Sequence, residues 1–375
     1  MCTQIVTPPR FVRSPSLAID SPVTIIKLFR GVLSKGGVIL KSFARLVRLF
    51  VLAAVVSSSA HASFSSLFIF GDSLSDSGNN AAILASVTPV PIPGNTFIPD
   101  FPYASGHYTN DQIWAQSFAS SLGLGTNPSI LGGTDYAFGG ARTGPLSPIP
   151  LPAGLFSPFP PGLETQAAYF LQQHANVAPS DALYVVAGGG NNAQDALTAI
   201  GGCGGNAGCI GAIIQSVAST FATDVATIVA ELELAGAEHI IVWDTPDVGK
   251  APAVVAAGGS TIGSILASSM SLALLGAIGG TPGVTFFDIF GLTDAVIANP
   301  GAFGLTNVTD ACAQFVACDP STYFFWDGIH PTSAGHGIIS NAMLALPLPE
   351  PPTLAVLAVV LAGLGFSRRQ RERNK

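Results

Sequence analysis

Short apolar runs rich in β-branched and aromatic residues alternate with longer helical stretches over most of this 375-residue chain. The runs expected to form strands are 67–70, 135–138, 182–187, 239–243 and 284–288. Apolar residues recur at helical spacing in 111–122, 210–234, 262–277 and 333–346. Strands that alternate with helices build a parallel sheet with helices on both faces. The sequence therefore predicts an α/β protein, a three-layer α/β/α sandwich around a parallel sheet of about five strands.

Three positions fall just past the ends of predicted strands. Ser73, Gly140 and Asn191 follow the first, second and third strand in turn. The carboxyl ends of parallel strands meet at one edge of a sheet, where α/β proteins bind their ligands. We therefore expect these three residues to lie along one edge.

The N-terminal part of the chain has the pattern of an export signal. Basic residues within 41–48 precede the apolar run 49–56, which is followed by the Ala-His-Ala sequence of 60–62. This order is typical of a secretory signal peptide, and the apolar run is too short to span a membrane. We predict that residues 1–62 are an N-terminal extension with a signal peptide and that residues 63–348 form one α/β domain.

The C-terminal part resembles a PEP-CTERM sorting signal. Pro349-Glu350-Pro351 leads into the apolar run 354–366 and then into an arginine-rich tail. The resemblance implies that residues 349–375 hold the protein at the inner membrane of a Gram-negative-type bacterium until a processing enzyme of the exosortase type cleaves them. The protein would then be extracellular or bound to the cell surface. The basic tail agrees with the positive-inside rule, and a plain C-terminal anchor is the alternative.

The region between these segments is strongly acidic. From Ser63 to Glu350 the chain has twenty acidic residues against only two basic ones, Arg142 and Lys250, which is a net charge of −18. Such a surface repels nucleic acids and offers no stripe for binding phosphates. Nucleic-acid partners are therefore excluded.

Four cysteines follow the predicted signal peptide, in two local pairs. Cys203 is close to Cys209, and Cys312 is close to Cys318. An even number of cysteines in an exported protein favours disulfides. A metal site is the alternative, but no histidine lies near either pair at ligand spacing. We expect two disulfides, no metal and no organic cofactor.

A proline-rich segment interrupts the alternating pattern. Residues 143–163 contain seven prolines with apolar side chains between them. Such a segment forms neither a helix nor a central strand, so we predict a stiff loop. Its apolar residues could cover an acyl pocket or pack onto the surface.

Two motifs that lie far apart in the sequence hold side chains able to act together in acyl transfer. Gly71-Asp72-Ser73-Leu74 directly follows the first predicted strand, and Asp327-Gly328-Ile329-His330 precedes the last predicted helix. A serine hydroxyl is a weak nucleophile until a base takes its proton, and a histidine base needs a partner that fixes its tautomer. Alone, the first motif could be a turn and the second a helix start.

These motifs resemble those of the GDSL, or SGNH, family of serine esterases and lipases, and the resemblance covers most of residues 67–345. Further blocks of the family pattern lie at 136–141 and 188–192. The resemblance implies the SGNH-hydrolase fold, which is flavodoxin-like. It also implies that Ser73 is the nucleophile, with His330 as its base and Asp327 as the residue that orients the base.

The same resemblance implies an oxyanion hole. Its donors would be the backbone N–H groups of Ser73 and Gly140 and the side-chain amide of Asn191. Two positions depart from the family pattern. Asn192 stands where the family usually has aspartate, so the resemblance does not say which structural hydrogen bonds form at this position. His107 stands where arginine is common, and this difference could alter the substrate cleft.

The sequence thus predicts an exported serine hydrolase that cleaves carboxylic esters. Its substrate could be a lipid or small ester, and the proline-rich loop favours longer acyl chains. It could instead be an O-acetyl group on extracellular polysaccharide, which the PEP-CTERM-like tail favours. A non-catalytic matrix-binding protein on the same scaffold is a third possibility, but the intact Ser73, Asp327 and His330 argue against it.

Overall fold

The computed structural model describes residues 64–84, 106–145, 159–315 and 317–347. The predicted signal peptide, the predicted sorting signal and most of the proline-rich loop lie outside these residues, so those predictions remain open.

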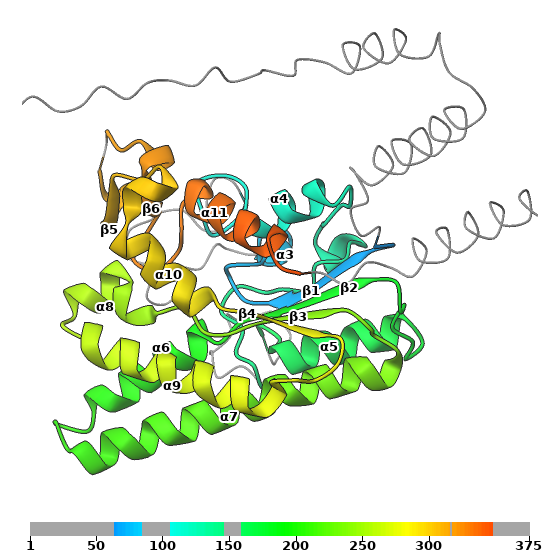
Figure 1. Cartoon of the computed structure of the whole chain (residues 1–375), viewed down its shortest axis with the longest axis horizontal. Helices are drawn as coiled ribbons and strands as arrows, with labels where there is room; N and C mark the ends of the chain where they lie inside the picture. Colours follow the sequence, from blue (N-terminus) through cyan, green and yellow to red (C-terminus); the bar gives the residue numbers. More distant parts are fainter. Residues whose placement is uncertain (1–63, 85–105, 146–158, 316, 348–375) are drawn as a thin grey trace, which may run out of the picture. The chain divides into compact units, whose positions relative to one another are not determined.

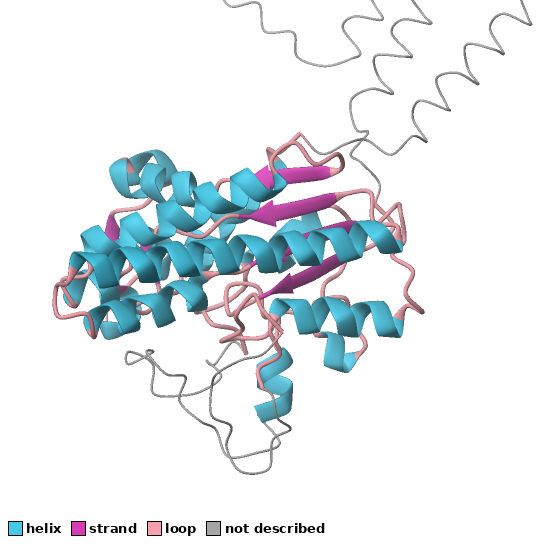
Figure 2. Cartoon of the chain, turned by 90° about the horizontal axis from the view of Figure 1, so that it is seen from below, coloured by secondary structure: helices cyan, strands magenta, loops and turns pink. Residues whose placement is uncertain are grey.

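The central sheet has four parallel strands in the order β1-β2-β3-β4 (Figures 1 and 2). They are β1 (Leu67–Gly71), β2 (Leu183–Ala187), β3 (Ile240–Trp243) and β4 (Val284–Phe287). The first three strands are buried at every position, as expected of a sheet that is covered on both faces. Four of the five predicted strands are confirmed with small changes at their ends.

The fifth predicted strand, 135–138, is not a regular strand. Its residues lie beside β1, where Asp135 forms an isolated parallel bridge with Ile69 and the N–H of Tyr136 donates to the carbonyl of Ile69 (2.8 Å). The carboxylate of Asp135 accepts a hydrogen bond from the N–H of Ala137 at 2.9 Å. The N–H of Phe138 donates to the carbonyl of Gly71 at 3.1 Å, so the contact of Asp135 with Ala137 uses a backbone group that does not face β1. The segment extends the sheet as an irregular edge.

Helices cover both faces of the sheet, which confirms the three-layer arrangement (Figure 1). The helices α5 (Leu163–Gln173), α7 (Ala207–Ala235) and α9 (Ser260–Ile278) pack on the face that carries Phe68 and Phe70. On the opposite face, α4 (Trp114–Ser121) and α11 (Ser333–Leu344) pack against Leu67 and Ile69. Successive residues of β1 thus alternate between the two halves of the core.

Several described elements were not predicted. They are α3 (Asn79–Leu84), α5, α6 (Gly190–Gly201), α8 (Pro252–Ala256), α10 (Ile289–Ala298), the 3₁₀ turns η1 (Ser129–Leu131), η2 (Val248–Lys250), η3 (Pro300–Phe303), η4 (Cys312–Gln314) and η5 (Pro320–Thr322), and a small parallel sheet of β5 (Asn307–Ala311) and β6 (Tyr323–Phe325). Both predicted disulfides are present, Cys203–Cys209 between α6 and α7 and Cys312–Cys318 after β5.

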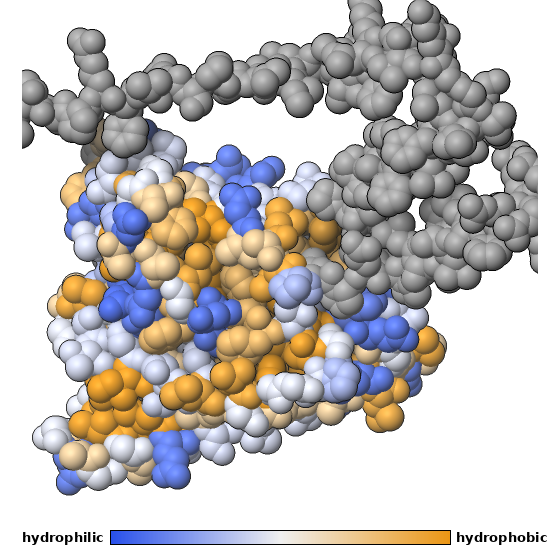
Figure 3. Space-filling view, in the orientation of Figure 1, coloured by the Kyte–Doolittle hydropathy of each residue, from blue (hydrophilic) through white to orange (hydrophobic). Residues whose placement is uncertain are grey.

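Two of the described helices, α7 and α9, are long and apolar enough to cross a membrane. Both contribute side chains to the core on one face of the sheet, a property that explains their apolar composition. Apolar side chains also gather on the surface over these helices, and Ile265 and Leu272 of α9 are exposed (Figure 3).

A buried glutamine of α5 fixes the end of β1. Gln166 accepts a hydrogen bond from the N–H of Gly71 (2.8 Å) and donates one to the carbonyl of the same residue (2.9 Å). Its amide also donates to the carbonyl of Pro161 at 3.0 Å. The side chain therefore satisfies backbone groups at the point where the chain leaves the sheet, one residue before Asp72.

Replacing Gln166 with leucine should lower the free energy of unfolding by about 2–3 kcal/mol, because buried polar groups of Gly71 would lose a partner. Urea denaturation followed by circular dichroism measures the change. The matched control is Gln172→Leu, since Gln172 is exposed on the same helix; it should change stability by less than about 0.5 kcal/mol. Equal stability of the wild type and Gln166→Leu would show that this contact does not support the strand end.

Candidate active site

The chain turns sharply after β1, and Asp72 defines the turn. Its carboxylate accepts a hydrogen bond from the N–H of Leu74 at 3.0 Å, and its carbonyl accepts two further backbone N–H groups. A side chain at Gly71 would meet the carbonyl oxygen of Ala187 at 2.8 Å, so the strand must end in glycine. The turn places Ser73 at the carboxyl edge of the sheet.

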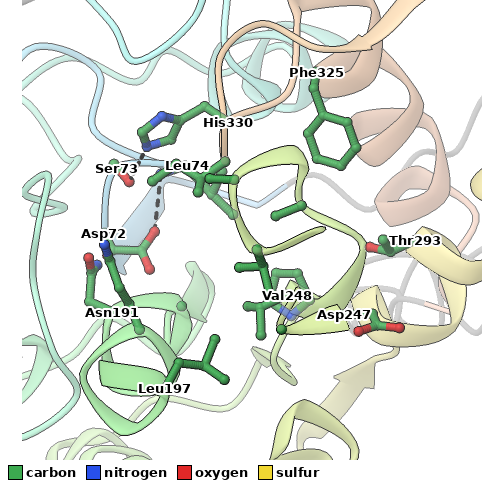
Figure 4. Close-up of a pocket in the computed structure, with 18 of the residues that line it drawn as sticks. Asp72, Ser73, Leu74, Asn191, Leu197, Asp247, Val248, Thr293, Phe325 and His330 are labelled. Carbon is green, nitrogen blue, oxygen red and sulfur yellow. Dashed lines mark hydrogen bonds between the residues drawn. The ribbon is translucent and has the colours of Figure 1, made fainter. Parts of the chain in front are cut away.

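The structure brings the side chains of Ser73, His330 and Asp327 into one hydrogen-bonded line. Nε2 of His330 lies 2.8 Å from Oγ of Ser73, and Nδ1 of the same ring lies 2.6 Å from Oδ2 of Asp327. Figure 4 shows Ser73 and His330 facing one another. All three residues are buried, with exposed fractions of 8%, 2% and 0%.

The surroundings of Asp327 favour its ionised form. Burial alone would raise its pKa, but the charge of His330, together with hydrogen bonds from the ring and the backbone, lowers the pKa below its usual value. Its Oδ1 accepts the N–H groups of Ile329 and His330, both at 2.7 Å. An ionised carboxylate only accepts hydrogen bonds, so we assign the ring hydrogen to Nδ1, which leaves a lone pair on Nε2 for Ser73.

The residues predicted for an oxyanion hole come from the turn after β1, the segment beside β1 and the start of α6. Asn191 stands in the first turn of α6 and lines the same cavity as Ser73 and His330. Its Nδ2 donates to the carbonyl of Ala141 at 2.9 Å, next to Gly140. Gly140 has a φ of 85°, a left-handed conformation that favours glycine. Neither the N–H of Ser73 nor that of Gly140 donates a hydrogen bond to another described residue.

A largely apolar cavity of about 560 Å³ opens beside Ser73 and His330 (Figure 4). Its walls come mostly from α6, η2, α8, α10, β6 and the turn before α11, with smaller parts from the turn after β1, α9 and α11. The apolar side chains that line it include Leu197, Ile200, Val248, Val254, Ile262, Phe325 and Ile329. Sequence reasoning missed this cavity, because most of its walls belong to elements that were not predicted.

Asp72 also lines the cavity, and sequence reasoning gave it no role of its own. Burial raises the pKa of its carboxyl group to about 6, although the hydrogen bond from Leu74 and the charges of His330 and Arg142 act in the opposite direction.

His107 does not line this cavity. Its Nδ1 lies 3.0 Å from the carbonyl oxygen of Asp111, and its Nε2 lies 3.1 Å from Nε2 of Gln116. Burial lowers the pKa of its ring. The histidine therefore packs in the segment that precedes α4.

Asn192 uses both ends of its amide. Oδ1 accepts a hydrogen bond from the N–H of Thr143 (3.2 Å), and Nδ2 donates to the hydroxyl of the same residue (3.0 Å). That hydroxyl donates in turn to Asp224 at 2.7 Å, so it can only accept from residue 192. An amide supplies the donor required here, whereas an aspartate would not.

The described residues contain no group of three or more His, Cys, Asp or Glu side chains that could hold a metal ion.

The family model for GDSL-like lipases and acylhydrolases matches residues 67–343. The chain belongs to this family. The matched residues include both motifs of the hydrogen-bonded line, and membership makes the protein an enzyme that hydrolyses ester bonds.

Relatives of this GDSL hydrolase occur in bacteria and plants. An uncharacterized protein of Pseudomonas putida is 26% identical over 317 residues, which cover 77% of this chain and 50% of the relative. A GDSL esterase/lipase of Arabidopsis thaliana is 25% identical over 329 residues, which cover 80% of this chain and 93% of the relative. Lipase 1 of Photorhabdus luminescens is 30% identical over 232 residues, which cover 59% of this chain and 29% of the relative. The chain thus spans half or less of the two bacterial relatives.

Acidification should stabilise the GDSL hydrolase domain. Burial raises the pKa of Asp72 to about 6 and that of Asp244 to about 7, both above the value of 3.8 expected in an unfolded chain. Between these values the folded state binds more protons than the unfolded state, so the stability from these groups is fully present below about pH 4 and is lost as the pH rises through 6 to 7. The buried ring of His336 acts in the opposite direction, because burial lowers its pKa to about 3 and only the unfolded state takes up its proton on acidification. With this loss set against the gain from the two carboxyl groups, we expect the free energy of unfolding to increase by about 2 kcal/mol from pH 7.5 to pH 5.

Urea denaturation at the two pH values tests this. Asp72→Asn keeps an acceptor for Leu74 and removes one titrating group, so its gain on acidification should be smaller than that of the wild type. A wild type that is less stable at pH 5 than at pH 7.5 would contradict the assignment.

Proposed function

We propose that this protein is an exported serine hydrolase that cleaves carboxylic esters with acyl chains longer than acetyl. The observation that carries the proposal is the hydrogen-bonded line of Ser73, His330 and Asp327 at the wall of an apolar cavity. The proposed chemistry uses side chains, backbone N–H groups and water.

In the proposed reaction, Oγ of Ser73 attacks the acyl carbon while Nε2 of His330 takes the hydroxyl proton. Asp327 keeps the ring in the required tautomer and stabilises the imidazolium that forms. His330 then gives the proton to the leaving alcohol. A water molecule, activated by the same ring, releases the acyl group from Ser73.

The negative charge that develops on the carbonyl oxygen requires donors that are already in place. The N–H groups of Ser73 and Gly140 are the proposed backbone donors. Asn191 holds the carbonyl of Ala141 with one amide hydrogen, which leaves its second hydrogen for the oxyanion. Preorganised donors of this kind are worth on the order of 3–4 kcal/mol each.

The cavity favours a longer acyl chain over an acetyl group. An acetyl group has a single methyl to bury, whereas this cavity offers about 560 Å³ beside the reacting serine. Burial of methylene groups against aliphatic walls contributes about 0.8 kcal/mol per CH₂. An acetylesterase for extracellular polysaccharide is the alternative, and only the sequence pattern of residues 349–375 supports it.

Export and processing are also part of the proposal. They rest on the order of residues in 1–62 and 349–375, where a signal peptide and a PEP-CTERM-like segment cleaved by an exosortase-type enzyme are predicted. The partner implied by this segment is a membrane-bound processing enzyme.

Ser73→Ala should lower the turnover of p-nitrophenyl esters by at least about 10⁴-fold, because the acyl group loses its acceptor. Unfolding curves should show that the variant remains folded. Ser120→Ala removes an exposed serine hydroxyl on α4 and should keep full activity. Retention of substantial activity by Ser73→Ala would refute the assignment of the nucleophile.

Leu197→Trp should narrow the acyl preference. The side chain of Leu197 projects from α6 into the cavity (Figure 4), so a larger residue would fill space that a long chain needs. We expect kcat/KM for p-nitrophenyl octanoate to fall by about 10-fold or more, with the acetate ester hardly affected. Leu234→Trp, at a position that is 91% exposed, is the control. A wild type that turns over only the acetate ester would favour the acetylesterase instead.

A further inference from the structure

The guanidinium group of Arg142 joins two elements of the site. Nε and Nη2 bind the two carboxylate oxygens of Asp195 at 2.9 and 2.7 Å, and Nη1 donates to the carbonyl of Gly140 at 2.6 Å. The side chain of Arg142 is 13% exposed. Arg142 is also one of only two basic residues between Ser63 and Glu350.

The ion pair with Asp195 connects Arg142 to the helix that carries Asn191. It lies four residues after Asn191 on α6, so the two side chains project from neighbouring turns of one helix. Arg142 thus links the loop that carries Gly140 to the helix that carries Asn191. A two-pronged contact between a guanidinium and a carboxylate fixes orientation as well as distance.

The peptide groups on both sides of Gly140 are held by side chains. Asn80 donates to the carbonyl of Gly139 at 3.0 Å, and this peptide carries the N–H of Gly140. Arg142 holds the carbonyl of the following peptide. Glycine has no Cβ to restrict rotation, so its conformation depends on such contacts more than that of any other residue.

We propose that Arg142 is a positioning residue for the oxyanion hole. Through Gly140 and Asp195, it fixes the backbone N–H of Gly140 relative to the side-chain amide of Asn191. This inference rests on the proposed function, in which those two groups bind the oxyanion. Arg142 itself touches neither substrate nor reacting atoms.

A second set of hydrogen bonds holds the loop of Arg142 in place, so the effect of removing Arg142 on the rate can be measured in a folded protein. Thr143, the next residue in the loop, is tied to α6 through Asn192 and to α7 through Asp224. The loop therefore stays attached when the guanidinium is removed. Asp195 is half-exposed, and an ion pair at such a site adds little to stability.

Arg142→Gln should lower kcat by about 10- to 100-fold and leave KM within about 2-fold of the wild type. The reason is that misplaced donors stabilise the transition state less, while the binding of the substrate hardly changes. Arg142→Lys keeps the charge but cannot hold both partners, and it should recover only part of the rate. Asp195→Ala should lower kcat in the same way, and the double variant Arg142→Gln/Asp195→Ala should be no slower than the worse single variant. Asp181→Asn, which alters an exposed hydrogen bond to Ser65, is the control.

Binding of a boronic acid separates positioning from a merely structural role, since it forms a tetrahedral adduct on the nucleophilic serine. Its affinity for Arg142→Gln should fall by about the same factor as kcat. A folded Arg142→Gln protein whose kcat and boronic acid affinity equal those of the wild type would overturn the proposal.

Hydrogen exchange tests the proposal without relying on turnover. Backbone amides in residues 139–143 should exchange at least about 10-fold faster in Arg142→Gln than in the wild type, with exchange in β1 and β2 unchanged. Equal exchange in the loop would overturn the positioning role. A wild type without Ser73-dependent turnover would instead refute the proposed function.

Discussion

The hydrogen bond between His330 and Ser73 joins side chains that are 257 positions apart in the sequence, and the surrounding structure serves to hold them together. Ser73 is placed by β1, whose end is bound by Gln166 of α5. His330 follows β6, and its backbone is bound by the carboxylate of Asp327. Neither segment would keep its position without the packed sheet. The proposed reactivity of Ser73 therefore depends on the folded domain rather than on either motif alone.

Buried carboxylates organise the loops at this edge of the sheet. Asp76 accepts backbone N–H groups of Gly78, Asn79 and Gly139 at 2.6–2.9 Å, although burial raises its pKa to about 6. Asp135 accepts the N–H of Ser77, from the loop after β1, and that of Ala137 in its own segment. Loop backbone has no ladder to satisfy its polar groups, so side-chain acceptors take that place. Some of the acidic residues of this chain therefore hold the loops of the site in place and are not charges on the protein surface.

The contact between Ser73, His330 and Asp327 could be predicted because these residues lie in two short motifs. The spacing of Asp327 and His330 is a local feature, and Ser73 follows a run that is clearly a strand. The cavity could not be predicted, because apolar periodicity shows that a face is buried but not which distant element covers it. The edge beside β1 is irregular for a local reason: Tyr136 and Phe138 donate to β1, but the N–H of Ala137 between them is bound by the carboxylate of Asp135. The role of Arg142 depends on a contact with α6, a helix that the sequence analysis did not identify.

The most direct test of the account is to locate the covalent intermediate. The protein is treated with an alkyl fluorophosphonate, which reacts with activated serines, and the modified peptide is identified by mass spectrometry. We expect one label per chain, on Ser73, and no label on Ser73 in the variant His330→Ala or after denaturation. Label on a different serine, or an active enzyme whose Ser73 stays unmodified when the reagent abolishes turnover, would contradict it.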